Sequence, residues 1–188
     1  VDLDAIAADI VAAGSIKELK TLMKKVINFA KLHPLLKEES AEALVGIVEA
    51  LAMLDSDTAA TLNTFEAQRY ALAKEALREA LKLSPKNEDI KLKYVALRLD
   101  NAKRVAKLGD PSLTGSAYTD FVSAYYNVKA LADRTGSVEA LAAKQQFEDI
   151  LKPRTLPTTP YVAHPAMGNC LDADYYTALN KKVEAEYK

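Results

Sequence analysis

Helix-breaking residues are scarce in this chain, and their placement limits it to long helices. Its 188 residues include only 6 Gly and 7 Pro, and four of the prolines lie together between Pro153 and Pro165. The remaining breakers divide residues 1–152 into stretches that are rich in Ala, Leu, Lys and Glu. All-β folds need many more turn residues at short intervals. The sequence therefore predicts an all-α fold.

Apolar residues recur at three- and four-residue steps in each stretch, which is the pattern of a helix with one buried face. Start and stop signals agree with this pattern: Ser15 and Glu18 form an S-x-x-E capping box, and His33-Pro34 ends the helix that follows. No stretch shows the two-residue period of a strand. Helices are expected at about residues 3–13, 16–32, 38–54, 63–83, 86–108, 116–134, 137–151 and 172–187, with an extended, proline-rich segment at 152–170.

The expected helices group into three parts. Residues 1–62 are predicted to form an N-terminal helical extension, residues 63–152 a four-helix up-down bundle, and residues 153–188 a proline-rich arm that ends in a short helix. The bundle is the expected core of the fold. Four of its side chains are predicted to be buried: Leu92, Leu99, Phe121 and Tyr125.

Charge is arranged in blocks, although the formal net charge is only −1. Residues 15–37 hold six Lys and one Glu, whereas residues 38–57 hold six acidic residues and no basic one. Because these two expected helices complement each other, we predict that they pair as an antiparallel hairpin.

A second basic block lies on the expected helix at residues 86–107, which carries seven basic and three acidic residues. Helical spacing places Lys93, Arg104 and Lys107 near one face. This face is either a solvated surface or a docking surface for an acidic protein. Nucleic acid is a poorer partner, because no aromatic side chains interleave with these charges.

Sequence signals for catalysis and metal binding are weak. One Cys and two His exclude the usual zinc frameworks, and no Glu-x-x-His pair of a di-iron bundle is present. The common nucleotide-binding and hydrolase motifs are also missing. A nucleophile pair of Cys170 and His164 would stand on proline-rich coil without an evident oxyanion site. The sequence therefore predicts no catalytic residue, no metal and no cofactor, and it favours core and rim positions over a pigment or quinone pocket for Tyr118, Tyr125 and Tyr126.

No apolar run approaches the length that crosses a bilayer, and the most apolar stretch, residues 43–54, contains Glu49. The chain begins at Val1, inside a helical pattern and without an initiating Met, which is consistent with prior removal of a targeting segment.

Four of the expected helices carry a family resemblance. Its most specific piece is Asp-Ile-Lys-Leu-Lys at 89–93, followed by Leu-Arg-Leu-Asp at 97–100. Together with Thr-Phe-Glu-Ala-Gln-Arg at 64–69 and the two amphipathic helices that follow, this pattern resembles the PsbQ family. Those proteins are four-helix extrinsic subunits of photosystem II in the thylakoid lumen. The resemblance covers residues 64–151, about half of the chain.

The resemblance implies a non-enzymatic subunit of the chloroplast thylakoid lumen, peripheral to the membrane and bound to subunits of a photosystem core or antenna. In the family, such subunits help to retain calcium and chloride for the oxygen-evolving manganese centre. Unlike the plant proteins, this chain has its extra helices before the bundle and its proline-rich arm after it. The predicted docking residues are Lys93, Arg104 and Lys107 on the bundle, with Tyr161 and His164 on the arm.

Other functions stay open. Residues 66–99 are similar to a tetratricopeptide helix pair, with an Ala-rich helix and the turn Ser84-Pro85-Lys86-Asn87 before the second helix. No second copy follows at about 34 residues, and fewer than three such repeats do not stack stably. A peptide-binding adaptor is therefore one alternative. A linker subunit of another thylakoid or organellar complex, of the photosystem I–antenna or NDH type, is the other.

Overall fold

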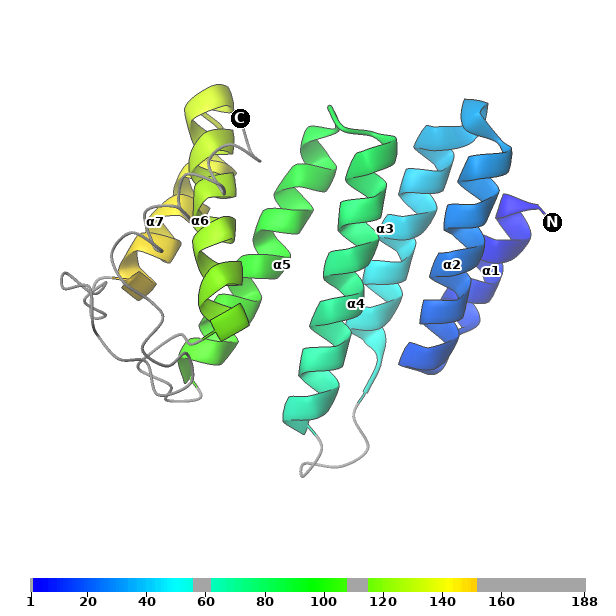
Figure 1. The fold of residues 1–188 in the computed structure, drawn as a ribbon, viewed down its shortest axis with the longest axis horizontal. Coiled ribbons are helices and arrows are strands. Elements are labelled where there is room, and N and C mark those ends of the chain that lie inside the picture. The colour runs from blue at the N-terminus through cyan, green and yellow to red at the C-terminus, as the bar shows by residue number, and fades with distance from the viewer. Residues whose placement is uncertain (1, 56–61, 108–114, 152–188) are drawn as a thin grey trace. The chain divides into compact units, whose positions relative to one another are not determined.

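The computed structural model of the chain describes residues 2–55, 62–107 and 115–151, and these ranges are built from helices and short turns (Figure 1). No strand occurs within them, which confirms the all-α prediction. The arm at 152–170 and the helix expected at 172–187 lie outside the described residues. The elements are α1 Leu3–Ala12, α2 Ile16–Leu32, the 3-10 turn η1 Pro34–Leu36, α3 Lys37–Met53, α4 Leu62–Leu83, α5 Glu88–Lys107, α6 Gly115–Thr135 and α7 Val138–Leu151.

Local capping interactions explain where several of these helices begin and end. The Ser15 hydroxyl accepts the Glu18 N–H at 3.1 Å, and the Glu18 carboxylate reaches back to accept the Gly14 N–H at 3.2 Å. This is the predicted capping box, with its second bond moved one residue upstream. At the start of α7, the Ser137 hydroxyl accepts the Ala140 N–H at 3.1 Å. Gly136, at φ +62°, ends α6 in the left-handed conformation that glycine adopts most easily.

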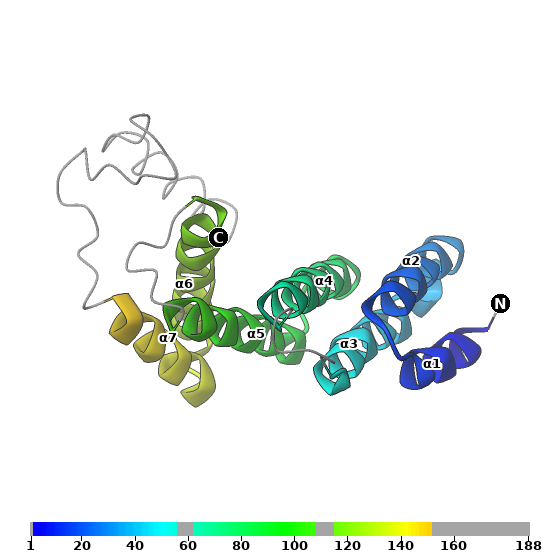
Figure 2. The same cartoon turned by 90° about the horizontal axis from the view of Figure 1, so that it is seen from below.

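The first compact unit, Val1–Leu97, contains α1 to α4 and the first half of α5. Helix α3 packs against α1, α2 and α4, and α2 also contacts α4. Seen along the helices in Figure 2, α1 and α3 lie in one layer and α2 and α4 in the other. Helix α3 therefore buries side chains against three neighbours: Ser40, Ala41, Ala43, Leu44, Ile47 and Leu51.

The core of this unit contains residues from before and after position 62, the expected end of the N-terminal extension. Its largest fully buried side chains are Leu19, Met23, Val26, Leu44, Ile47, Leu51 and Leu77, and Ile90 and Tyr94 of α5 join the same cluster. The structure groups Val1–Leu97 in one compact unit and Arg98–Lys188 in the other. Within the first unit, α3 supplies side chains on which α4 packs. The expected boundaries at 62/63 and 152/153 stay a prediction.

The predicted pairing of α2 with α3 is present, but its physical basis differs from the prediction. Apolar side chains form the interface, and the lysines of α2 point outward. None of the six lysines between residues 15 and 37 forms an ion pair with a residue that the structure describes. Hydrophobic burial, rather than charge pairing, therefore joins the two helices.

Two polar bonds tie α3 to the α4 region, one at each end of α3. The Ser84 hydroxyl donates to Glu38 at 2.6 Å, beside the start of α3. At the other end, Arg69 donates from Nη2 to the Leu54 carbonyl at 2.7 Å, while its guanidinium lies 4.6 Å from the centre of the Phe65 ring. Because Leu54 caps the C-terminus of α3, this cation also meets the negative end of the helix dipole.

The described part of the second unit, Arg98–Lys188, holds the second half of α5 with α6 and α7. Helices α6 and α7 pack against each other, and Val128 and Phe147 are fully buried. Lys103 of α5 donates to Gln146 of α7. Of the side chains predicted to be buried, Leu99 is buried and confirms the prediction; Leu92 and Tyr125 are half-buried, and that of Phe121 lies outside the described part.

Candidate functional site

The structure describes the side chains of only two of the five predicted docking residues. Lys93 is exposed on the first half of α5 and belongs to the first unit. Arg104 belongs to the second unit, is half-buried and donates to Asn101 Oδ1 at 2.9 Å. The side chain of Lys107 and all of Tyr161 and His164 lie outside the described residues. The docking role of these five residues stays a prediction.

Within the described ranges, no three His, Cys, Asp or Glu side chains gather in a way that could hold a metal ion. The same ranges contain no helix with the length and apolar character that a membrane span requires.

One polar cluster ties α6 to α7. The Tyr125 hydroxyl donates to Glu148 Oε1 at 3.0 Å, and Lys144 Nζ lies 3.9 Å from the same oxygen. Burial of the phenol, together with its hydrogen bond to the Glu148 carboxylate, raises the pKa of Tyr125 to about 12. Tyr126 lies beside it, with ring centroids 5.6 Å apart. Tyr125 and Tyr126 are both half-buried, which agrees with the predicted core and rim positions; the side chain of Tyr118 lies outside the described part.

This cluster predicts an alkaline transition in the second unit. A phenol whose pKa is higher in the folded than in the unfolded state stabilises the fold below its unfolded value near 10. That contribution is lost as the pH rises through about 12. We expect Tyr125→Phe to remove this transition from the pH dependence of stability, while Tyr126→Phe retains it. Denaturant titrations between pH 8 and 12 provide the measurement, and an unchanged profile in Tyr125→Phe would contradict the assignment.

The turn between α2 and α3 exposes three leucines that the sequence pattern did not single out. Leu35 is 97% exposed, Leu32 77% and Leu36 37%; we call these three residues the leucine turn. The turn is held by a hydrogen bond from the Leu36 N–H to the His33 carbonyl at 2.9 Å. The His33 ring also packs on Phe29, with centroids 4.3 Å apart. A well-held turn thus presents apolar side chains to solvent.

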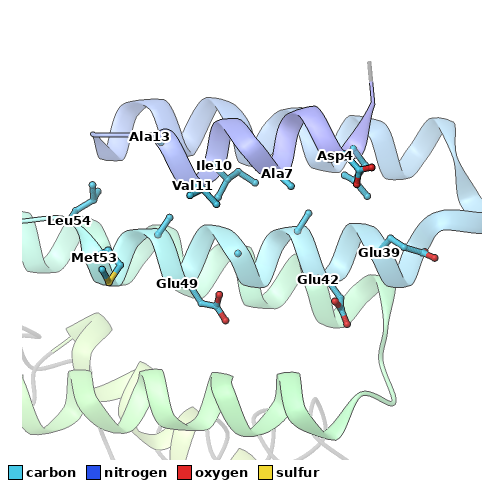
Figure 3. A pocket seen from close by; sticks show the side chains of 14 residues that line it. Asp4, Ala7, Ile10, Val11, Ala13, Glu39, Glu42, Glu49, Met53 and Leu54 are labelled. Atoms are coloured by element: carbon cyan, nitrogen blue, oxygen red, sulfur yellow. The ribbon is translucent and has the colours of Figure 1, made fainter.

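A second surface is an open groove of about 720 Å³ between α1 and α3, called here the α1–α3 groove (Figure 3). Ala7, Ile10 and Val11 of α1 point toward α3 in this view. Small residues of α3 form the floor: Ala43, Gly46 and Ala50. Met53 and Leu54 close the end nearest Val11. The groove is therefore apolar along its floor and at one end.

Carboxylates border the rest of the groove. Glu42 and Glu49 lie along the edge of α3 away from α1, and Asp4 and Glu39 lie at the end opposite Met53 (Figure 3). No Lys, Arg or His is among the lining residues that the structure describes. The acidic block at 38–57 is evident in the sequence. It was expected to pair with the lysines of residues 15–37, so its position along a groove was not predicted.

Comparisons with family models, with curated proteins and with solved structures gave no match to this chain.

Proposed function

We propose that this chain is a non-enzymatic accessory subunit that docks on a larger protein complex. The leucine turn carries the proposal, because Leu32 and Leu35 are largely exposed at a short, hydrogen-bonded turn and lie outside the core of the chain itself. Burying one such side chain in a partner is worth about 1.5–3 kcal/mol. The exposed residues Lys31 and Lys37 flank the turn and would favour an acidic surface around the contact.

The host that we propose is the lumenal side of photosystem II, where the subunit would stabilise the assembly and its oxygen-evolving centre. The PsbQ-like pattern of residues 64–151 supports this host, and so does the basic block on α5. In this proposal, residues 63–152 form a four-helix up-down bundle. The protein lies in the chloroplast thylakoid lumen, peripheral to the membrane. Lys93, Arg104 and Lys107 would contact acidic lumenal loops, with Tyr161 and His164 of the arm on neighbouring subunits.

A peptide-binding adaptor is the second candidate, and one observation favours it. Helices α1 to α4 alternate between two layers, which is how helical-repeat proteins stack their units and build binding surfaces. Such an adaptor would bind a segment of its partner in a groove and would not need the leucine turn.

Docking can be tested by sedimenting the full chain with thylakoid membranes stripped of extrinsic proteins. We expect binding at low salt and release at high salt, because exposed charge contacts are screened over about 8–10 Å at physiological ionic strength. Leu32→Ser with Leu35→Ser is expected to lower the bound fraction about tenfold or more. The matched control is Val138→Ser with Leu141→Ser, which changes two exposed apolar residues of α7.

Each outcome separates one part of the proposal from another. A chain that stays in the supernatant beside the stripped membranes at low salt rules out this host. A chain that binds equally well with both leucines replaced rules out the leucine turn as the contact. Co-purification from the native source would then identify the other complex, and binding to no complex would favour the adaptor.

A further inference from the structure

We propose that the α1–α3 groove binds a basic amphipathic helix of a partner protein. This goes beyond the proposed function, because the groove is a separate surface from the leucine turn and has its own chemistry. Three features carry the inference: the shape of the floor, the apolar end and the acidic edge.

The floor of the groove is a stripe of small residues. Ala43, Gly46 and Ala50 fall at positions i, i+3 and i+7 of α3, so they form one stripe with little side-chain volume. A Cβ added at Gly46 would lie 4.0 Å from Ile10 Cγ2, so α1 packs beside this glycine without covering the whole stripe. A ridge of apolar side chains can therefore lie along the open side of the groove, over α1 and α3 together, as ridges lie over grooves in ordinary helix packing.

The apolar end shows that this groove is not sealed by the described part of the chain. Val11 is 85% exposed and Met53 82%, although both line the groove. Large apolar side chains at the end of an open groove are typical anchors for an amphipathic helix. Met53 also adapts its shape easily to a partner, because its side chain is unbranched.

The acidic edge identifies the charge of the occupant. Glu42 and Glu49 are seven residues apart on α3, which is about 10.5 Å or two helical turns. Neither carboxylate has a hydrogen bond or ion pair within the described structure, and the same holds for the side chains of Asp4 and Glu39. A partner helix with Lys or Arg at seven-residue spacing beside its apolar stripe would pair with this edge.

The same features set the length of the partner helix and disfavour a lipid surface. With a rise of about 1.5 Å per residue, α1 and α3 limit the groove to the span of about 10–17 residues of helix. Four carboxylates around the groove would repel an anionic membrane. We therefore infer a helical protein segment as the occupant.

The test uses a fluorescein-labelled synthetic peptide of 17 residues, made of Leu, Ala and Lys. Its leucines recur at three- and four-residue steps, and its lysines flank them at seven-residue spacing. A second peptide carries Glu in place of every Lys. Fluorescence anisotropy with the full chain is expected to show binding of the basic peptide, weakened by salt, and no binding of the acidic one.

Charge reversal then locates the site. Glu42→Lys with Glu49→Lys is expected to weaken binding of the basic peptide about tenfold, since it removes two surface ion pairs and adds repulsion. The control, Asp9→Lys with Glu75→Lys, changes the net charge equally at two exposed carboxylates outside the groove, and we expect less than a twofold effect. Gly46→Leu fills the floor and is expected to reduce binding at least tenfold while the helical circular dichroism is kept. Leu32→Ser with Leu35→Ser is expected to leave binding of this peptide unchanged.

Several results would overturn the inference. Equal binding of the acidic peptide, or equal loss in the two double charge variants, would show non-specific attraction. A dimer of the free chain that Glu42→Lys with Glu49→Lys dissociates would identify a second copy as the occupant. Binding to vesicles containing phosphatidylserine that is lost in Gly46→Leu would assign the groove to lipid. The thylakoid sedimentation experiment is independent of these results, because its variants change the leucine turn and leave the groove intact.

Discussion

Replacing Leu44 with Ala is expected to destabilise the first compact unit by about 2–5 kcal/mol. Leu44 is 0% exposed, and it lies on α3, the helix that contacts α1, α2 and α4. The lost side chain leaves a cavity that these three helices cannot close without moving. Chemical denaturation followed by circular dichroism gives the free energy of unfolding. Leu35→Ala, at the nearly fully exposed position of the leucine turn, is the matched control and is expected to change it by less than about 0.5 kcal/mol.

The Leu44→Ala variant also tests how the chain is divided. Hydrogen exchange should rise in α2, α3 and α4 together, because α4 packs on α3. If residues 1–62 were a peripheral extension of a separate bundle, α4 would keep its protection in this variant.

Phe147→Ala is expected to destabilise the second unit by about 3–5 kcal/mol. Phe147 is fully buried on α7, in the unit where α7 packs on α6. Hydrogen exchange should therefore rise in α6 and α7, while α2 and α3 keep their protection. Leu141→Ala changes an exposed position of the same helix and serves as the control. An equal rise in α2 would show that the chain unfolds as one cooperative unit.

Helix positions were predictable from the sequence because their signals are local. The capping box at Ser15 and Glu18 and the His33-Pro34 stop both act within a few residues, and the described helices begin and end within a few residues of the predicted positions. Backbone groups at helix ends need partners nearby, so the residues that supply them are close in sequence.

The pairing of helices was harder to predict, because several apolar faces could satisfy one another. Nothing in the sequence showed that α4 would be among the neighbours of α3. Charge blocks suggested the α2–α3 pair for a reason that the structure does not support. Leu92 shows the same limit, since its helical position is compatible with a buried or a half-buried side chain.

The candidate surfaces were missed for a related reason. Leu35 and Leu36 follow a proline and lie between the helices expected at 16–32 and 38–54, so no helical period placed them, and the short 3-10 turn leaves Leu35 outside. Ala43, Gly46 and Ala50 are compatible with a packed core, and only the spatial arrangement shows that they form an open floor. Two leucines beside a turn proline, between two lysines, were the signal that could have identified the leucine turn.

Helix α5 has a consequence for how the chain matures during synthesis. Its residues Ile90 and Tyr94 complete the core of the first unit, while its second half, from Arg98, belongs to the next. At about 5–20 residues per second, the ribosome needs roughly 5–20 s to make Val1–Leu97. Until Tyr94 has emerged, the nascent α1 to α4 array lacks part of its core. A translational pause just after α5 would therefore let the first unit close before the second begins to fold.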